Sequence, residues 1–180
     1  MFMLYVILGN TLSGKTTLAR DLRTVTGVKQ IITYTNRPMR DGEVDGVDYH
    51  FVSTEEIEKE DYFGKRYFYT NYRDEPFIYA MKKEDFVLFD DTIIISDPRG
   101  LREIKNLIGY QQVVSVFVDI PEKRILERAK KRGDSIDEVQ RRLSVDHDDF
   151  ASARYWADIS INPDDEDILN LLFMKLKGKI

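Results

Sequence analysis

The nine residues from Gly9 to Thr17, GNTLSGKTT, join an apolar segment to a helix-forming one. The preceding run MFMLYVIL predicts a buried strand, and the following LARDL favours a helix. Gly9 and Gly14 suit a tight turn, because its backbone needs angles and close approaches that a Cβ would obstruct. A strand, a glycine-rich turn and a helix in succession predict the opening unit of an α/β fold.

Further apolar runs rich in Ile, Val and Tyr occupy residues 30–35, 92–96, 113–118 and 159–161. They are continuous rather than alternating, which is typical of strands buried on both faces. Helix-compatible stretches separate most of them, and Ser53 and Ser135 each precede a glutamate by three residues, the spacing of a capping box that begins a helix. We therefore expect a central parallel sheet of five strands flanked by helices.

The composition limits the partners of the chain. It has 180 residues, 42% of them hydrophobic, which predicts one domain over residues 1–180. Its 27 basic and 32 acidic residues give a net charge of −5, so we expect no nucleic acid and no membrane as partner. The chain has no cysteine, which excludes disulfides and cysteine-bound metals and favours a cytoplasmic location.

The glycine-rich turn also carries a chemical signal. Gly9-x-x-x-x-Gly14-Lys15-Thr16 matches the P-loop pattern, in which backbone N–H groups at a helix N-terminus surround phosphate oxygens. Lys15 would reach the β- and γ-phosphates, and the hydroxyl of Thr16 would bind Mg²⁺. The sequence therefore predicts a site for ATP and Mg²⁺ made of Gly9, Asn10, Thr11, Leu12, Ser13, Gly14, Lys15, Thr16 and Thr17.

A second candidate phosphate site follows the apolar run at 30–35. Arg37 and Arg40 precede a tight turn, and Tyr49 lies on a short predicted strand. Two guanidinium groups and a phenol can converge on one phosphate, because the forked donors of arginine match its oxygens. Two surface arginines and a half-buried tyrosine are the alternative interpretation of the same residues.

The segment TYTNRPMRDGEVDGVDYHF resembles the guanylate kinase family pattern Ser-x-Thr-Thr-Arg-x-Pro-Arg-x-Gly-Glu-x-x-Gly-x-x-Tyr-x-Phe. The proline is one place earlier, at Pro38, and nine positions are in register: Thr33, Thr35, Arg37, Arg40, Gly42, Glu43, Gly46, Tyr49 and Phe51. The stretches 96–100, 128–133, 140–143 and 161–162 are also similar to family segments. The resemblance covers nearly the whole chain.

This resemblance implies a P-loop kinase fold with a core at about 1–35, 82–121 and 157–180, a mixed β insertion that binds the acceptor at about 36–81, and a helical lid at about 122–156. It implies phosphoryl transfer from Mg-ATP to a nucleoside monophosphate, GMP or dGMP, by a monomer or homodimer. The implied catalytic residues are Lys15, Arg37, Arg128 and Arg142. Arg132 and Asn162 would contact ATP, and the implied acceptor contacts are Thr33, Arg37, Arg40, Tyr49, Thr70, Tyr79 and Asp97.

Two of these positions remain open. Asp97 would face the acceptor base or a water on Mg²⁺, or it would cap the helix that begins at Pro98. The family reads guanine partly through a glutamate about nine residues before a Tyr-Gly-Thr/Ser sequence, and placing residues 79–81 there puts Thr70 at that position, without the charged oxygen pair that suits the base. Asp74 or Glu75 would have to replace it.

Three interpretations therefore compete. The first is a guanylate kinase. The second keeps the fold and changes the acceptor to another deoxynucleotide or a ribose phosphate. The third is a non-catalytic guanylate-kinase-like interaction module, and because such modules typically lack a working P-loop, the intact Lys15 and Thr16 favour an enzyme.

Overall fold

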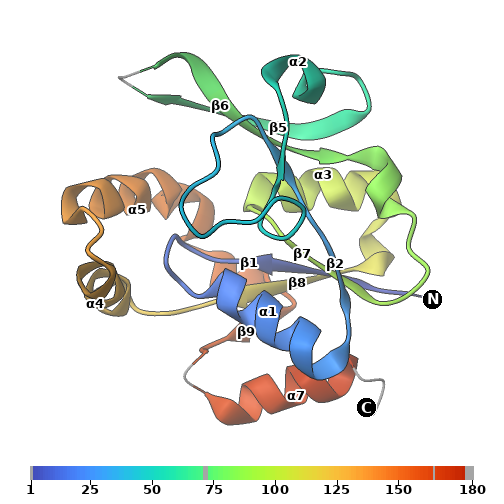
Figure 1. Ribbon diagram of the computed structural model, residues 1–180. Coiled ribbons are helices and arrows are strands. Elements are labelled where there is room, and N and C mark those ends of the chain that lie inside the picture. Colours follow the sequence, from blue (N-terminus) through green and yellow to red (C-terminus); the bar gives the residue numbers. More distant parts are fainter. Residues whose placement is uncertain (1, 71–72, 164, 177–180) are drawn as a thin grey trace.

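The structure is a computed structural model that describes residues 2–70, 73–163 and 165–176. Its centre is a five-stranded sheet of β1 (Leu4–Leu8), β2 (Lys29–Ile31), β7 (Thr92–Ile95), β8 (Val113–Val118) and β9 (Ile159–Ile161) (Figure 1). The strand order is β2-β7-β1-β8-β9, and every neighbouring pair is parallel. The parallel α/β sheet predicted from the continuous apolar runs is confirmed.

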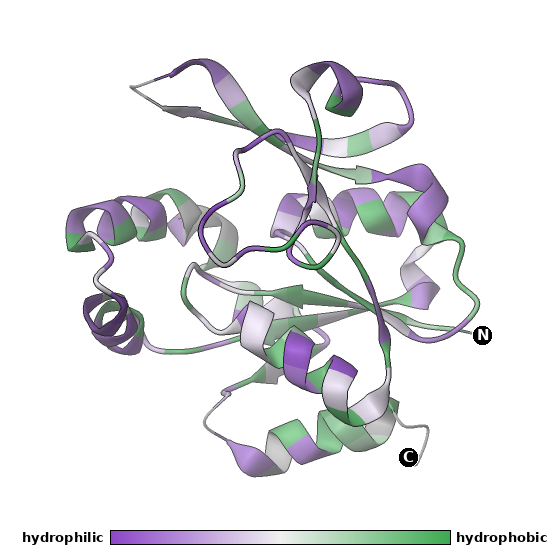
Figure 2. Ribbon diagram, in the orientation of Figure 1, coloured by the Kyte–Doolittle hydropathy of each residue, from purple (hydrophilic) through white to green (hydrophobic). Residues whose placement is uncertain are grey.

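Helices cover both faces of this sheet. Alternate residues of β1 point to opposite faces, and all five are buried. Leu4, Val6 and Leu8 pack with α3 (Pro98–Ile108), whereas Tyr5 and Ile7 pack with α1 (Lys15–Thr26) and α7 (Glu166–Leu176). Figure 2 shows the contrast between the hydrophobic central strands and the strongly hydrophilic α4 (Glu122–Arg132).

A second, mixed sheet lies above the first in Figure 1. It contains β3 (Tyr34–Thr35), β4 (His50–Phe51), β5 (Tyr62–Thr70) and β6 (Arg73–Lys82) in the order β4-β3-β6-β5. Ile57 of α2 (Thr54–Ile57) packs with Ile78 and Ala80 on one face of β6. Met81 points to the opposite face and belongs to the core cluster of the central sheet, so that face is turned toward the central sheet.

The prediction of one strand over residues 30–35 is wrong. The chain leaves the central sheet after Ile31 and enters the second sheet at Tyr34, so the apolar run divides into β2 and β3. The carbonyl of Thr33 accepts a hydrogen bond from the His50 N–H at 2.9 Å, which ties this crossing segment to β4. The apolar run therefore continues while the chain crosses from the central sheet to the mixed sheet.

The remaining helices follow the central strands. Short 3₁₀ segments occupy Lys83–Phe86 and Tyr110–Gln112, and α4, α5 (Ile136–Phe150) and α6 (Ala153–Trp156) precede β9. Ser53 and Ser135 accept the predicted N-terminal hydrogen bonds of α2 and α5, at 3.1 and 3.4 Å. The helices α4 and α5 pack together through Ile125, Ala129 and Val139, and Leu12 joins that cluster. This contact connects the helical pair to the glycine-rich turn.

Candidate active site

The turn after β1, residues 9–14, which we call the glycine-rich loop, has a backbone that only glycine suits at its two ends. A Cβ on Gly9 would lie 2.9 Å from the carbonyl oxygen of Val118, the last residue of β8. Gly14 has φ +104°, and a Cβ there would lie 3.2 Å from Nη1 of Arg128. Between them Leu12 has φ 57°, an uncommon value for a residue with a side chain. The loop is therefore compact and locally strained.

The N-terminus of α1 follows directly and suits an anion. Gly14 caps it without a side-chain hydrogen bond, and its first turn carries no acidic residue. The first N–H groups of a helix have no intrahelical acceptor, and the helix dipole is positive at this end. The hydroxyl of Ser13 is buried and has no hydrogen-bond partner within the described part of the chain. These donors and this backbone fit the phosphates of ATP.

Two of the predicted catalytic cations lie at this loop. Lys15 Nζ donates to the carbonyls of Gly9 and Asn10, each at 2.8 Å. Arg128 of α4 donates through Nη1 to the carbonyls of Ser13 and Leu12, at 2.8 and 3.2 Å. The side chains of Thr16 and Thr17 are exposed beside them. Two residues that the sequence assigned to one catalytic group thus both contact the glycine-rich loop.

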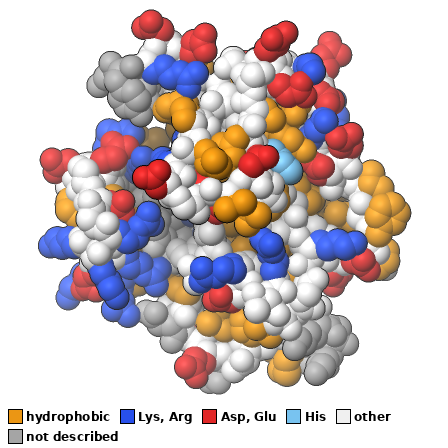
Figure 3. Space-filling view, in the orientation of Figure 1, with side chains coloured by type: hydrophobic (Ala, Val, Ile, Leu, Met, Phe, Trp, Pro, Cys, Tyr) orange, Lys and Arg blue, Asp and Glu red, His pale blue; other side chains and the backbone are white. Residues whose placement is uncertain are grey.

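Other predicted ATP contacts have partners elsewhere. Arg132 Nε lies 3.4 Å from Asp134, and Arg142 Nε donates to Glu138 at 2.8 Å. Hydrogen bonds from Arg141 and then Arg142 lower the pKa of Glu138 to about 2. Both predicted arginines thus pair with acids of their own helical segment. The predicted Asn162 is an exposed residue directly after β9. Figure 3 shows Lys and Arg side chains gathered on the left, where α4 and α5 lie in Figure 1.

Arg37 is the centre of a second cluster, on the mixed sheet. Its side chain is only 6% exposed, and it donates from Nη1 and Nη2 to the two oxygens of Glu43, at 3.0 and 2.8 Å. Nε donates to the hydroxyl of Tyr79 at 3.1 Å, and Nη1 also donates to the carbonyl of Pro38 at 2.7 Å. Four of the five guanidinium N–H groups are therefore engaged, and one on Nη2 has no acceptor among the described residues.

Two other predicted acceptor residues, Tyr49 and Arg40, contact this cluster. Tyr49 lies under its guanidinium, with 5.3 Å between Cζ and the ring centroid. Burial raises the pKa of the Tyr49 phenol, while the nearby charges of Arg37 and Arg40 oppose that shift. Arg40 is exposed, and its backbone N–H donates to Glu43 at 2.7 Å. Hydrogen bonding from Arg37 keeps the pKa of Glu43 below its ordinary value. The half-buried Thr33 contributes its backbone carbonyl to β4.

Asp97 follows β7 and contacts a residue of the mixed sheet. Its Oδ1 accepts a hydrogen bond from the Gly100 N–H at 2.7 Å, so it caps α3, as the helix-cap interpretation predicted. Its Oδ2 lies 3.3 Å from Nη1 of Arg66 on β5, a residue that the sequence did not single out. Ile7 pairs with Ile95, so the chain passes from β1 into the glycine-rich loop and from β7 to Asp97 at the same sheet edge. Open α/β sheets bind ligands at this edge.

Thr70 lies at the far end of the β5–β6 hairpin. Its backbone is paired with Arg73, whereas Arg66 is paired with Tyr79. The side chain of Thr70 is outside the described part of the structure. Asp74 and Glu75 are exposed near the same end, and Glu75 lies 3.4 Å from Arg73. The residue opposite Tyr79 is therefore a cation, Arg66, and not Thr70.

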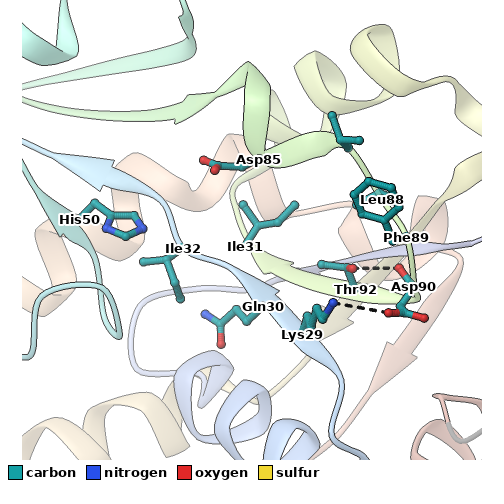
Figure 4. A pocket seen from close by; sticks show the side chains of 11 residues that line it. Lys29, Gln30, Ile31, Ile32, His50, Asp85, Leu88, Phe89, Asp90 and Thr92 are labelled. Carbon is teal, nitrogen blue, oxygen red and sulfur yellow. Dashed lines mark hydrogen bonds and ion pairs between the residues drawn. The ribbon is translucent and has the colours of Figure 1, made fainter.

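Two pockets adjoin other surfaces, one of them next to the glycine-rich loop. One, of about 250 Å³, runs along the edge strand β2 and is lined by Lys29, His50, Asp85 and Thr92 among others (Figure 4). Its lining contains no residue of the glycine-rich loop. A second, of about 260 Å³, adjoins Asn10 of the loop and is bounded by Asp119, α4 and α5. Within the described ranges, no group of three acidic or histidine side chains forms a metal cluster, and no helix is long and apolar enough to cross a membrane.

Phosphate-binding groups that approach one sheet edge from two sheets are what a nucleoside monophosphate kinase requires, and the fold and site place the chain in that class. The chain belongs to the guanylate kinase family, because the family model described as Guanylate kinase matches residues 1–174. It is 36% identical to a guanylate kinase of Symbiobacterium thermophilum, over 79% of this chain and 69% of that protein. It is 30% identical to the guanylate kinase of Carboxydothermus hydrogenoformans, over 98% and 91%.

Solved structures share the fold. A guanylate kinase from Anaplasma phagocytophilum has a TM-score of 0.64 at 20% identity and covers 99% of this chain and 86% of its own. A sugar kinase from Janibacter sp. has a TM-score of 0.52 at 17% identity, with coverage of 99% and 98%. Both likenesses describe the backbone arrangement alone.

Proposed function

We propose that this protein transfers the terminal phosphoryl group of ATP to the phosphate of GMP or dGMP. The observation that carries the proposal is the contact of Arg66 with Asp97, which ties the mixed sheet that carries Arg37 to the sheet edge that carries the glycine-rich loop. Lys15 and Arg128 belong to the loop side, and Arg37 with Tyr49 belongs to the mixed sheet. The relatives in the family, named guanylate kinases, support GMP as the acceptor.

The acceptor phosphate needs positioning rather than deprotonation. Its second pKa is about 6, so it is largely ionised at neutral pH. Glu43, Tyr79 and Pro38 hold Arg37 in one orientation, and the remaining N–H on Nη2 would donate to the phosphate. The exposed guanidinium of Arg40 and the hydroxyl of Tyr49 would complete its contacts. Charge neutralisation and alignment then supply most of the rate.

The donor side uses the P-loop. The N–H groups at the start of α1 would hold the phosphates of ATP, and Lys15 would exchange its carbonyl contacts for phosphate oxygens. Thr16, with Asp97 through a water, would hold Mg²⁺, which neutralises phosphate charge when bound. Arg128 stands at the loop and would face the transferring group.

Closure of the helical segment 122–156 would complete the site. We propose that Arg142 leaves Glu138 and that Arg132 leaves Asp134 when phosphates are bound, because phosphate offers these arginines more charge than an exposed carboxylate. Asn162 would then lie against the adenine end of ATP. A closed lid also keeps water from accepting the phosphoryl group.

The test measures ADP release from Mg-ATP with GMP, dGMP, the other nucleoside monophosphates and ribose phosphates in turn. We expect the highest kcat/KM with GMP or dGMP, loss of turnover with every acceptor in Lys15→Ala, and a raised KM for GMP with unchanged KM for ATP in Arg40→Gln. Lys59→Ala, an exposed lysine on the far side of α2, serves as the control. Turnover with a ribose phosphate and with no nucleotide would show that the acceptor is a sugar phosphate rather than GMP or dGMP. No ADP with any acceptor, together with no ATP binding, would instead indicate an interaction module.

A further inference from the structure

One cation on the acceptor side takes no part in the proposed phosphoryl transfer. Arg66 of β5 is paired with Tyr79 of β6. Directly opposite residues of an antiparallel pair point to the same face, so Arg66 shares a face with the tyrosine that holds Arg37. That face is turned toward the central sheet, because Met81 of the same face belongs to its core. Arg66 therefore lies beside the proposed acceptor phosphate site, on the face that is turned toward the central sheet.

The local backbone explains why this side chain reaches the central sheet. The pairing of β5 with β6 is irregular between Phe63 and Arg66, and Gly64 within that irregularity has φ +61°. Bulges of this kind re-aim the side chains that follow them. A Cβ on Gly64 would also lie 3.8 Å from the Cβ of Glu103, so β5 passes close to α3. The bulge thus directs Arg66 to the start of α3, where Asp97 lies.

The contact between Arg66 and Asp97 leaves donors unused. The side chains are 22% and 32% exposed, and Nη1 of Arg66 lies 3.3 Å from Oδ2 of Asp97. Nη1 is nevertheless buried without a partner in hydrogen-bond geometry among the residues that the structure describes. A buried donor without an acceptor costs free energy, because it has lost its hydrogen bonds to water. A bound group that accepts from this guanidinium would recover that free energy.

The charge of the pair selects the kind of ligand. A second phosphate near Arg66 would also approach the carboxylate of Asp97, which would repel it. A neutral ligand with two adjacent acceptors avoids this repulsion and matches the fork of the guanidinium. The O6 and N7 atoms of guanine form such an edge, and arginine commonly binds them through two hydrogen bonds, whereas adenine presents an amino donor beside its N7.

We propose that Arg66 is a specificity-determining residue that donates hydrogen bonds to the O6 and N7 edge of the guanine base of the acceptor nucleotide. The inference rests on the proposed function, since it names the residue that reads the base in the same site. It also accounts for Thr70 at the position where the count from Tyr79 expects a glutamate. A glutamate would accept hydrogen bonds from the N1–H and amino edge of guanine, whereas Arg66 would donate to the opposite, O6 and N7, edge.

The experiment tests GMP analogues that each differ at one group against variants of Arg66, in the manner of a double-mutant cycle. kcat/KM is measured for GMP, 7-deaza-GMP, 6-thio-GMP and IMP with the wild type, Arg66→Gln, Arg66→Lys and the control Arg73→Gln, an arginine at the far end of the same hairpin. The first two analogues alter N7 or O6, and IMP lacks only the amino group on the other edge. Each cycle reports the coupling between the side chain and one atom.

We expect Arg66→Gln to lower kcat/KM for GMP by about 10- to 100-fold, mainly through KM, with KM for ATP unchanged. The wild type should discriminate against 7-deaza-GMP and 6-thio-GMP, and Arg66→Gln should lose most of that discrimination while keeping the IMP-to-GMP ratio. Arg66→Lys keeps the charge without the fork and should lose discrimination as well. Arg73→Gln should behave as the wild type.

Equal discrimination in the wild type and in both Arg66 variants would overturn the inference and leave the proposed function intact. A wild type that phosphorylates no nucleotide would remove the proposed function and this inference together. A variant that is partly unfolded loses rate with every ligand equally, so the ratios between ligands stay interpretable. If Arg66→Gln cannot be purified in a folded form, Arg66→Lys decides by the same ratios.

Discussion

Replacing Glu43 by glutamine removes one charge from the most buried ion pair described in the structure. The carboxylate accepts from Nη1 and Nη2 of Arg37, at 3.0 and 2.8 Å, and from the backbone N–H of Arg40 at 2.7 Å. The two side chains of the pair are 6% and 19% exposed, so water replaces the lost contacts poorly. Glutamine keeps one acceptor oxygen but turns an NH₂ group toward Arg37.

The magnitude follows from this geometry. Breaking a fully buried pair costs about 3–5 kcal/mol, because one charge is left unpaired. Glutamine still accepts one hydrogen bond, and Glu43 is partly exposed, so we expect Glu43→Gln to lower the free energy of unfolding by about 2 kcal/mol. For a domain of this size that corresponds to a fall in Tm of about 4–8 °C. KM for GMP should rise about tenfold, because Arg37 loses its fixed orientation.

Thermal unfolding and steady-state kinetics measure these effects, with Glu58→Gln as the matched control. Glu58 also takes part in three contacts, to Lys65 at 3.2 Å and to Tyr67 at 3.1 and 3.2 Å, but its side chain is 43% exposed. Exposed pairs contribute about 0–1 kcal/mol, so Tm of the control should fall by no more than about 4 °C. Equal shifts in the two variants would refute the role of burial. A lower KM for GMP in Glu43→Gln would show that Glu43 competes with the phosphate for Arg37.

The effect should also depend on pH. Hydrogen bonding from Arg37 lowers the pKa of Glu43 in the folded state, so the carboxylate stabilises the fold above its unfolded pKa. This contribution is lost as the pH falls through the lowered, folded pKa. The difference in Tm between the wild type and Glu43→Gln should be constant above about pH 5 and should shrink below the ordinary glutamate pKa of about 4.3. A difference that grows on acidification would contradict the assigned pair.

Three further outcomes are expected. Gly9→Ala should lower Tm and abolish ATP binding, since its Cβ would lie 2.9 Å from the Val118 carbonyl oxygen. The control Gly27→Ala meets nothing within 4 Å and should lower Tm only through its φ of +76°, and differential scanning calorimetry measures both shifts. Arg128→Gln should lower kcat about 10- to 100-fold, with the exposed Lys130→Gln near the wild-type rate in the ADP-release assay. Glu138→Gln should shift Tm by no more than about 4 °C at neutral pH, because its pairs with two arginines are exposed. A larger fall would show that the α5 surface is coupled to the core.

Local patterns predicted most of the central sheet. The runs 113–118 and 159–161 coincide with β8 and β9, because strands buried on both faces need uninterrupted apolar residues. The run 30–35 has the same pattern, yet it contributes to two sheets, and the chain crosses between them at Ile32 and Thr33. No glycine or proline marks this crossing, and hydrophobicity alone does not record which sheet a residue enters.

The site shows the same division between local and tertiary information. Gly9, Gly14 and Lys15 could be found from spacing alone, because one continuous turn and helix start supply them. Arg37 could be found as well, but not its engagement by Glu43 and Tyr79, which decides how many donors remain for a phosphate. The sequence identified Arg37 as a candidate, whereas the packing around it decides how many of its N–H groups can bind a phosphate.

The proposed base-reading residue follows from strand pairing, which counting along the chain does not give. A count of nine residues back from Tyr79 reaches Thr70, which is paired with Arg73 at the far end of the hairpin. Across the strands, the partner of Tyr79 is Arg66, whose approach to Asp97 also requires the bulge at Gly64 and the position of α3. Under the proposed role of Arg66, the choice of base depends on the bulge and not on the length of the hairpin. Shortening β5 and β6 by the same number of residues beyond Phe68 and Phe77 should leave the choice of base unchanged, whereas removing the bulge should alter it.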